Sequence, residues 1–225
     1  MLLLRRFVLA LAATALDALL LLVALGGWSA LLSHARALAL VAIWGAGALV
    51  LAWLRPIGRQ DTIAIDRDRA IVLIALFLLP LLSTPLAAWG ERTLVWRWPE
   101  PPVLAWAGVG LAGIGLAIRI TAMAQLGTRF SPLVAMQREH SLETRGLYGW
   151  VRHPGYLGAW LAAFGGALAF QSALGLPAVL LMGWLLQKRV KREEALLERH
   201  FGEAYRGYRA RTGRFLPRLV PPAES

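Results

Sequence analysis

The sequence predicts an all-α integral membrane protein, a polytopic bundle of five to six transmembrane helices. Hydrophobic residues make up 58% of its 225 residues, and the mean hydropathy is +0.57, both more than a soluble globular domain carries. The apolar residues fall into runs of about 17–22, a length that crosses a hydrocarbon core of roughly 30 Å. We therefore expect a single membrane domain over residues 1–225, with N-terminal helices in 1–123, a more polar region in 124–217 and a tail in 218–225.

Six apolar segments account for the predicted helices, at residues 7–28, 37–54, 70–90, 103–123, 154–170 and 173–186. Arg5 and Arg6 precede the first segment as in a signal peptide, but that run is too long and has no small-x-small cleavage site, so we expect a retained helix. The last two segments are short, are separated by Gln171 and Ser172, and Pro177 lies in the second. They predict a tight helical hairpin that crosses the bilayer fully or only in part.

A charged but helically patterned stretch, residues 188–211, follows the hairpin. Its apolar and aromatic residues recur at steps of three and four, at Leu196, Leu197, Phe201, Tyr205 and Tyr208. This spacing predicts a cytoplasmic, C-terminal amphipathic helix near the membrane interface. Residues 220–225 show no such pattern, and we expect them to be disordered.

The basic residues predict the orientation of the chain. With a cytoplasmic N-terminus, six spans leave only Arg36, Arg92 and Arg97 of the 24 Lys and Arg residues on the outer side, in accord with the positive-inside rule. We expect both termini in the cytoplasm and a multi-pass protein in the inner membrane of a bacterium. Topology and membrane lipids also account for the net charge of +11, so we expect no nucleic-acid partner.

The sequence contains no cysteine, which excludes disulfides, thiolate metal ligands and a cysteine nucleophile. We expect no metal centre. Gly108, Gly110 and Gly113 match the spacing of a dinucleotide-binding loop, but they lie inside an apolar helix with no preceding strand. Gly108 and Gly115 therefore indicate close packing of two helices.

Two charged residues lie within predicted spans. Asp17 is costly in lipid unless it faces the bundle, where it is either a functional group or a partner in a structural hydrogen bond. Arg119 lies near the cytoplasmic end of its helix, where it either extends to the interface or meets a substrate.

Residues 140–156, which precede a predicted helix, are rich in polar and aromatic side chains. The stretch holds two histidines, two arginines, two tyrosines and a tryptophan, and Pro154 suits the first turn of the helix. Unpaired N–H groups at a helix start favour an anionic ligand group. The alternative is a basic interfacial anchor with belt aromatics.

A second cluster lies at Arg189 and Glu193, four residues apart on one helix face. They either form an ion pair of a few tenths of a kcal/mol, or bind ligands separately. In the second case Glu193 accepts hydrogen bonds from a polar ligand and Arg189 meets an acidic substrate.

Three ordered motifs resemble the isoprenylcysteine carboxyl methyltransferase family, which is related to phospholipid N-methyltransferases. They are LETRGLY at residues 142–148, RHPGYLG at 152–158, and Glu193-Glu194 followed by FGxxY at 201–205. The resemblance covers residues 130–217 and implies that residues 124–217 form a cofactor-binding catalytic region. The implied cofactor is S-adenosyl-L-methionine, bound at the cytoplasmic ends of the last helices.

The resemblance also implies which residues do what. Arg189 would lie near the substrate carboxylate, and Glu193 would close the cofactor pocket, which makes these two the expected catalytic residues. The other expected cofactor-binding residues are His140, Ser141, Leu142, Glu143, Tyr148, His153, Pro154, Gly155 and Tyr156.

The implied activity is methyl transfer to a lipophilic acceptor that enters from the bilayer, an isoprenylcysteine-like carboxylate. A carboxylate needs no general base, and orientation and exclusion of water would supply most of the catalysis. Two alternatives remain open. One is a methyltransferase for phospholipid amines or small thiols, and the other is a non-enzymatic membrane transporter or assembly protein of the same fold.

Overall fold

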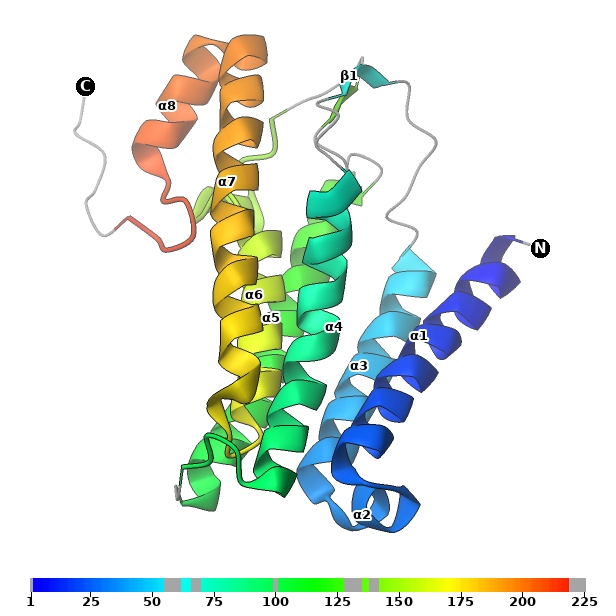
Figure 1. Ribbon diagram of the computed structural model, residues 1–225. Helices are drawn as coiled ribbons and strands as arrows, with labels where there is room; N and C mark the ends of the chain where they lie inside the picture. Colours follow the sequence, from blue (N-terminus) through cyan, green and yellow to red (C-terminus); the bar gives the residue numbers. More distant parts are fainter. Residues whose placement is uncertain are drawn as a thin grey trace.

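The computed structural model describes residues 2–54, 62–65, 70–98, 101–127, 135–137 and 142–218. Its long helices run roughly side by side (Figure 1). The elements in chain order are α1 (Leu2–Leu25), α2 (Trp28–Ser33), α3 (Ala35–Leu54), β1 (Thr62–Ile65), α4 (Ala70–Thr93), α5 (Pro102–Leu126), β2 (Ala135–Gln137), η2 (Gly146–Gly149), α6 (Pro154–Leu168), η3 (Ala173–Gly175), α7 (Leu176–Phe201) and α8 (Glu203–Arg211). His140, Ser141 and the tail from residue 219 onward lie outside the described residues.

The predicted polytopic helix bundle is confirmed. In the described part of the chain, four helices are long and apolar enough to cross a membrane, over Leu4–Leu25, Ala35–Leu54, Val72–Thr93 and Pro102–Leu126. They correspond to α1, α3, α4 and α5, the first four predicted segments. Helix α6 has 15 residues and α7 begins apolar but ends charged, so these two stand apart from the four long apolar helices.

The last two apolar segments form the predicted hairpin, with η3 between α6 and α7. The predicted boundary after residue 186, however, is wrong. Helix α7 continues through the charged stretch to Phe201 and breaks only at Gly202, which has a φ of 51°. The change from apolar to charged residues changes the environment of the helix, but the helix itself ends where a glycine adopts a left-handed conformation. The predicted separate helix over 188–211 is therefore the end of α7 plus the short α8.

Close contact between α5 and α6 confirms the structural reading of the glycines. A Cβ atom added to Gly108 would lie 2.6 Å from the Ala169 backbone nitrogen, and one added to Gly115 would lie 2.4 Å from the Ala162 nitrogen. Both distances are too short for a side chain, so the two backbones approach as in small-residue helix pairs of membrane proteins. This contact fixes α6 against α5.

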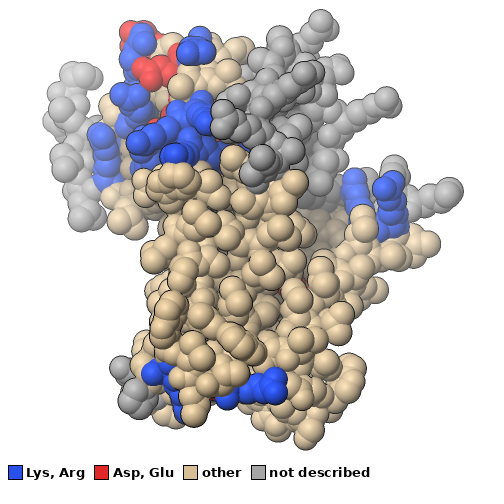
Figure 2. Space-filling model, in the orientation of Figure 1, with Lys and Arg blue, Asp and Glu red and all other residues tan. Residues whose placement is uncertain are grey.

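Charge divides the molecule along its long axis. Figure 2 shows Lys and Arg at both ends and a broad uncharged band between them, with the larger basic group at the end that holds α8. Such a band is what a helix bundle presents to the hydrocarbon core of a bilayer. Among the described residues, β1 and β2 form a small antiparallel pair at the α8 end of the bundle (Figure 1).

Candidate active site

One cavity of about 760 Å³ extends through the bundle, with walls from α1, α3, α4, α5, α6, α7 and α8. Its volume is within the range of about 300–1,000 Å³ that is typical of small-molecule sites. One part of its lining is apolar and comes mainly from α1, α3 and α4, including Leu16, Leu51 and Phe77. The other part is polar and comes from the chain before α6 and from α6, α7 and α8. The same space therefore offers both an apolar chamber and a polar end.

Tyr156 organises the polar end. Its hydroxyl accepts a hydrogen bond from Nε of Arg189 at 2.8 Å and donates one to Oε2 of Glu193, also at 2.8 Å. Arg119 from α5 reaches the same region, where its Nη1 donates to the Gly155 carbonyl at 3.1 Å. All five residues line the cavity. Two guanidinium groups and one carboxylate thus meet at the start of α6, and the polar end combines cationic and anionic groups.

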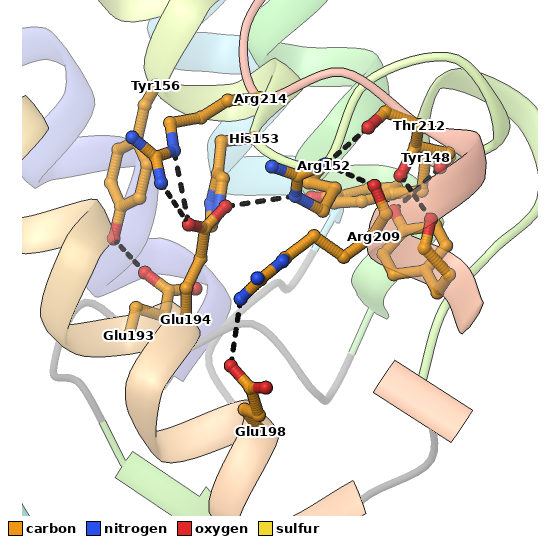
Figure 3. Close-up of polar contacts among 11 residues, drawn as sticks. Tyr148, Arg152, His153, Tyr156, Glu193, Glu194, Glu198, Arg209, Thr212 and Arg214 are labelled. Atoms are coloured by element: carbon orange, nitrogen blue, oxygen red, sulfur yellow. Dashed lines mark hydrogen bonds and ion pairs between the residues drawn. The ribbon is translucent and has the colours of Figure 1, made fainter. Parts of the chain in front are cut away.

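Glu194, which follows Glu193, turns away from Tyr156 and holds the chain around the site together (Figure 3). Its Oε1 accepts from Nε of Arg152 at 2.9 Å, and its Oε2 accepts from Nε of Arg214 at 3.1 Å. Nε2 of His153 lies 3.4 Å from the Oε1 atom. The side chains of Glu194 and Arg152 are only 6% and 7% exposed. This carboxylate therefore joins α7 to the chain before α6 and to the chain after α8.

The groups around Glu194 lower the pKa of its carboxyl group. Burial alone would raise that pKa, but the close contact with His153, hydrogen bonds from Arg214 and Arg152, and the charge of Arg152 outweigh burial and hold it well below its ordinary value. Glu194 is consequently ionised at neutral pH, and its buried charge is compensated.

Further bonds tie α8 and the chain after it to the residues that precede α6. Arg152 donates through Nη1 to the Thr212 carbonyl, and its backbone N–H donates to the Gly213 carbonyl at 2.8 Å. The hydroxyl of Tyr208 donates to the Tyr148 carbonyl at 2.7 Å. Together with Glu194 these contacts, which we call the Glu194 clamp, enclose the polar end of the cavity.

The segment before α6 begins with a turn that requires glycine. Gly146 has a φ of 55°, and a Cβ atom there would lie 2.2 Å from the side chain of Gln125. The amide oxygen of Gln125 accepts from the Leu147 N–H at 3.1 Å. The turn thereby places Tyr148, which is 9% exposed, against the cavity.

Most of the residues predicted for the site line this one cavity. They are Leu142, Glu143, Tyr148, His153, Gly155, Tyr156, Arg189 and Glu193. Pro154 is fully buried in the first turn of α6, and it is not among the residues that line the cavity. His140 and Ser141 lie outside the described residues.

Comparison with known proteins shows which family part of the chain resembles. The family model for isoprenylcysteine carboxyl methyltransferase matches residues 108–199. A protein-S-isoprenylcysteine O-methyltransferase of Schizosaccharomyces pombe is 34% identical over 118 residues, which are 51% of this chain and 50% of that protein. The enzyme of the same name from Xenopus laevis is 30% identical over 164 residues, 68% of this chain and 57% of that protein. Residues 108–199 of the chain are thus similar to the isoprenylcysteine carboxyl methyltransferase family.

The fold is also similar to that of a solved structure. A solved structure of a eukaryotic intramembrane Ras methyltransferase, an isoprenylcysteine carboxyl methyltransferase, superposes with a TM-score of 0.51 and 23% sequence identity, over 80% of this chain and 67% of that one. The chain spans only about half the length of the S. pombe relative. The isoprenylcysteine carboxyl methyltransferase match includes most of α5, all of α6 and most of α7, and it leaves α1, α3 and α4 outside.

Sequence reasoning missed several residues of this candidate site. Tyr205 was recognised only as a motif position and part of an amphipathic stripe, and Tyr208 only as part of that stripe, yet both line the cavity. Arg152 and Glu194 were recognised as motif positions, but the clamp between them was not predicted. A helical projection of α7 would have helped, because it places Glu194 about 100° from Glu193 and so toward a different neighbour.

Proposed function

We propose that this chain is an S-adenosylmethionine-dependent methyltransferase that methylates the carboxylate of a lipophilic, isoprenylcysteine-like acceptor. The observation that carries the proposal is the continuity of the cavity: an apolar chamber between membrane helices opens onto the two arginines and the carboxylate around Tyr156. A lipophilic acceptor that enters from the bilayer would place its chain in the chamber and its carboxylate at the polar end. The similarity of residues 108–199 to the isoprenylcysteine carboxyl methyltransferase family supports this reaction.

The polar end favours an anionic acceptor over an amine. Arg189 is 3% exposed, and with Arg119 it brings two permanent positive charges to the cavity wall. Guanidinium groups pair with carboxylates through charge-assisted hydrogen bonds, whereas an ammonium group would be repelled. This supports Arg189 as the group that orients the acceptor, and it makes Arg119 a second cation for the same carboxylate.

The residues present suit the proposed cofactor. Tyr205 lines the cavity, and its buried hydroxyl has no hydrogen-bond partner among the described residues, which makes it a candidate to bond to a ligand. Backbone N–H groups in the first turn of α6, at Gly155 and Tyr156, have no partner within a helix and suit a carboxylate. Glu193 can accept from a ligand hydroxyl or ammonium group. Tyr148, His153 and Leu142 would complete the cofactor wall, with Glu143 beside them.

When bound, S-adenosylmethionine supplies an electrophilic methyl group on a sulfonium centre. The carboxylate oxygen of the acceptor would form the bond to this methyl carbon as the bond between carbon and sulfur breaks, and the electron pair would stay on sulfur. No proton moves, so no side chain has to act as a base. The work of this chain is to hold Arg189 and Glu193 at fixed positions through Tyr156, and to exclude water with the Glu194 clamp.

Cofactor binding and methyl transfer test the proposal directly. We expect the purified protein in nanodiscs to bind S-adenosylmethionine and its demethylated product at one site, and each to raise the melting temperature, because a ligand that binds only the folded state must stabilise it. With radiolabelled cofactor, N-acetyl-S-farnesylcysteine should become labelled as a base-labile ester. Binding of neither ligand, or label only in phospholipid amines or thiols, would contradict the proposal.

The proposed site needs the cofactor side of the protein to face the cytoplasm. The basic end that holds α8 should therefore be cytoplasmic, and the opposite end, with Arg97 between α4 and α5, should be external. A fluorescent protein fused after Pro217 in a bacterial host should be fluorescent, and alkaline phosphatase fused at Arg97 should be active. The reverse pattern would place the site away from the cytosolic cofactor and would exclude the mechanism.

A further inference from the structure

The apolar chamber contains two polar side chains that the methyl-transfer reaction does not use. Asp17 of α1 and Thr84 of α4 both line the cavity. They lie on helices that are outside the family match at residues 108–199. A chamber that only held a hydrocarbon chain would have no use for either group.

Asp17 lies inside the span Leu4–Leu25. In the described part of the chain, no hydrogen bond or ion pair involves its carboxyl group. A carboxyl group at this depth is expensive and rare unless it faces the interior of the bundle and meets a polar partner. Asp17 meets the first condition through the cavity, and a partner for it is missing within the chain as described.

Thr84 provides an independent sign of a ligand. The residue is 1% exposed, and its hydroxyl has no hydrogen-bond partner among the described residues. A threonine in a helix often bonds to the carbonyl four residues earlier, which here belongs to Pro80. That carbonyl instead accepts from the hydroxyl of Ser83 at 3.0 Å. Thr84 thus lines the cavity as a residue, and its buried hydroxyl, which lies against Gly166, has no partner among the described residues.

The two groups lie at the same depth. Asp17 precedes the end of α1 at Leu25 by eight residues, and Thr84 precedes the end of α4 at Thr93 by nine. These spacings correspond to about 12–14 Å along each helix. Helices α1 and α4 pack against each other, and both end at the same side of the bundle (Figure 1).

Packing on α6 fixes Thr84 at this level. A Cβ atom added to Gly166 would lie 2.4 Å from the Thr84 hydroxyl oxygen and 3.2 Å from Cζ2 of Trp44. The glycine therefore makes room for the threonine and the tryptophan side by side, and Trp44 also lines the cavity. The hydroxyl group is held within a packed wall.

We infer that Asp17 and Thr84 form a polar subsite that selects acceptors whose apolar chain carries a hydrogen-bond donor, a hydroxyl or an amino group. The inference rests on the proposed function for the location of the acceptor chain. A donor on the chain bonds to the Asp17 carboxyl group, and the Thr84 hydroxyl bonds to the same group from α4. A chain of hydrocarbon alone leaves both side chains unsatisfied, and a site built for hydrogen bonds discriminates against an analogue that lacks the bonding group.

Competing acceptors test the subsite. The wild-type protein would be given N-acetyl-S-farnesylcysteine and analogues with a hydroxyl or an amino group part-way along the farnesyl chain. We expect kcat/KM to be about tenfold higher or more for at least one analogue than for the plain acceptor. Asp17→Leu and Thr84→Val should each reduce that preference, while Asp17→Asn should keep most of it because an amide still forms hydrogen bonds. An unchanged preference in both Asp17→Leu and Thr84→Val, or no preference in the wild type, would overturn the inference.

Thr14→Val is the matched control, because the Thr14 hydroxyl bonds to the Ala10 carbonyl of its own helix at 2.9 Å and does not line the cavity. It should leave the acceptor preference unchanged. A second readout needs no methyl transfer: farnesol or farnesylamine should raise the melting temperature of the wild type more than the hydrocarbon farnesene does, and Asp17→Leu should abolish the difference. If no acceptor is methylated, the proposed function fails while this arm still decides the subsite. If all acceptors react equally and all three lipids stabilise equally, the function stands and the subsite is refuted.

Discussion

Glu194→Gln should destabilise the folded protein by about 3–5 kcal/mol, because breaking one side of a buried ion pair leaves the other charge without compensation. The charge that remains is the guanidinium of Arg152, whose side chain is only 7% exposed. The same change weakens the contact with Arg214 and so loosens the end of the chain from α7. The measurement is thermal unfolding in detergent or nanodiscs, followed by the fluorescence of the tryptophans.

The pH dependence of this effect has a definite sign. The pKa of Glu194 in the folded state is lowered, so its contribution is complete above the ordinary glutamate pKa of about 4.3 and is lost as the pH falls below that value. The stability difference between wild type and Glu194→Gln should be constant from about pH 8 to pH 5 and shrink in more acidic solution. A difference that disappears between pH 8 and pH 6 would contradict the assignment.

Glu198→Gln provides the matched control for this prediction. Glu198 lies one turn further along α7 and pairs with Arg209 at 2.9 Å, but its side chain is 31% exposed and that of Arg209 is 49% exposed. An exposed pair is worth under about 1 kcal/mol, so the control should have little effect. Equal losses for the two variants would show that burial of Glu194 does not matter.

Arg189→Ala should lower kcat/KM about 100-fold while cofactor affinity changes little. Each hydrogen bond from a buried guanidinium to a carboxylate contributes roughly 1.5–3 kcal/mol, and the proposed acceptor depends on this group. Glu193→Ala should instead weaken S-adenosylmethionine binding about tenfold or more, because the carboxylate would bond to that ligand. Calorimetric affinity and steady-state kinetics report the two losses separately.

The outcome also separates this assignment from a simple ion pair on α7. A pair with no ligand role predicts small and similar stability losses for both variants, with cofactor binding and turnover unchanged. Lys191→Ala is the control for the loss of a charge, because Lys191 is exposed on the same helix and is not part of the cavity wall. Mild and equal effects of Arg189→Ala and Glu193→Ala would exclude separate roles in binding.

Local patterns in the sequence were sufficient for several features of the site. The start of α6 follows from Pro154, and the close α5–α6 contact follows from Gly108 and Gly115, because both depend on residues within one or two helices. Arg189 and Glu193 share one helix face, as their spacing of four predicts, and both line the cavity. The end of α7 was missed because the pattern of charge was taken for a break, whereas the break depends on the φ angle at Gly202.

The sequence by itself determined that this protein is a membrane helix bundle with a polar site before and after its last hairpin, since bilayer thickness sets the length of apolar segments and helical periodicity sets their faces. Only the tertiary structure decided which polar groups meet. Tyr156 joins Arg189 to Glu193 across two helices, and Glu194 joins Arg152 to Arg214 across 62 residues of chain. Asp17 and Thr84 face one chamber for the same reason: contacts between distant segments depend on how whole helices pack, and no local pattern encodes that packing.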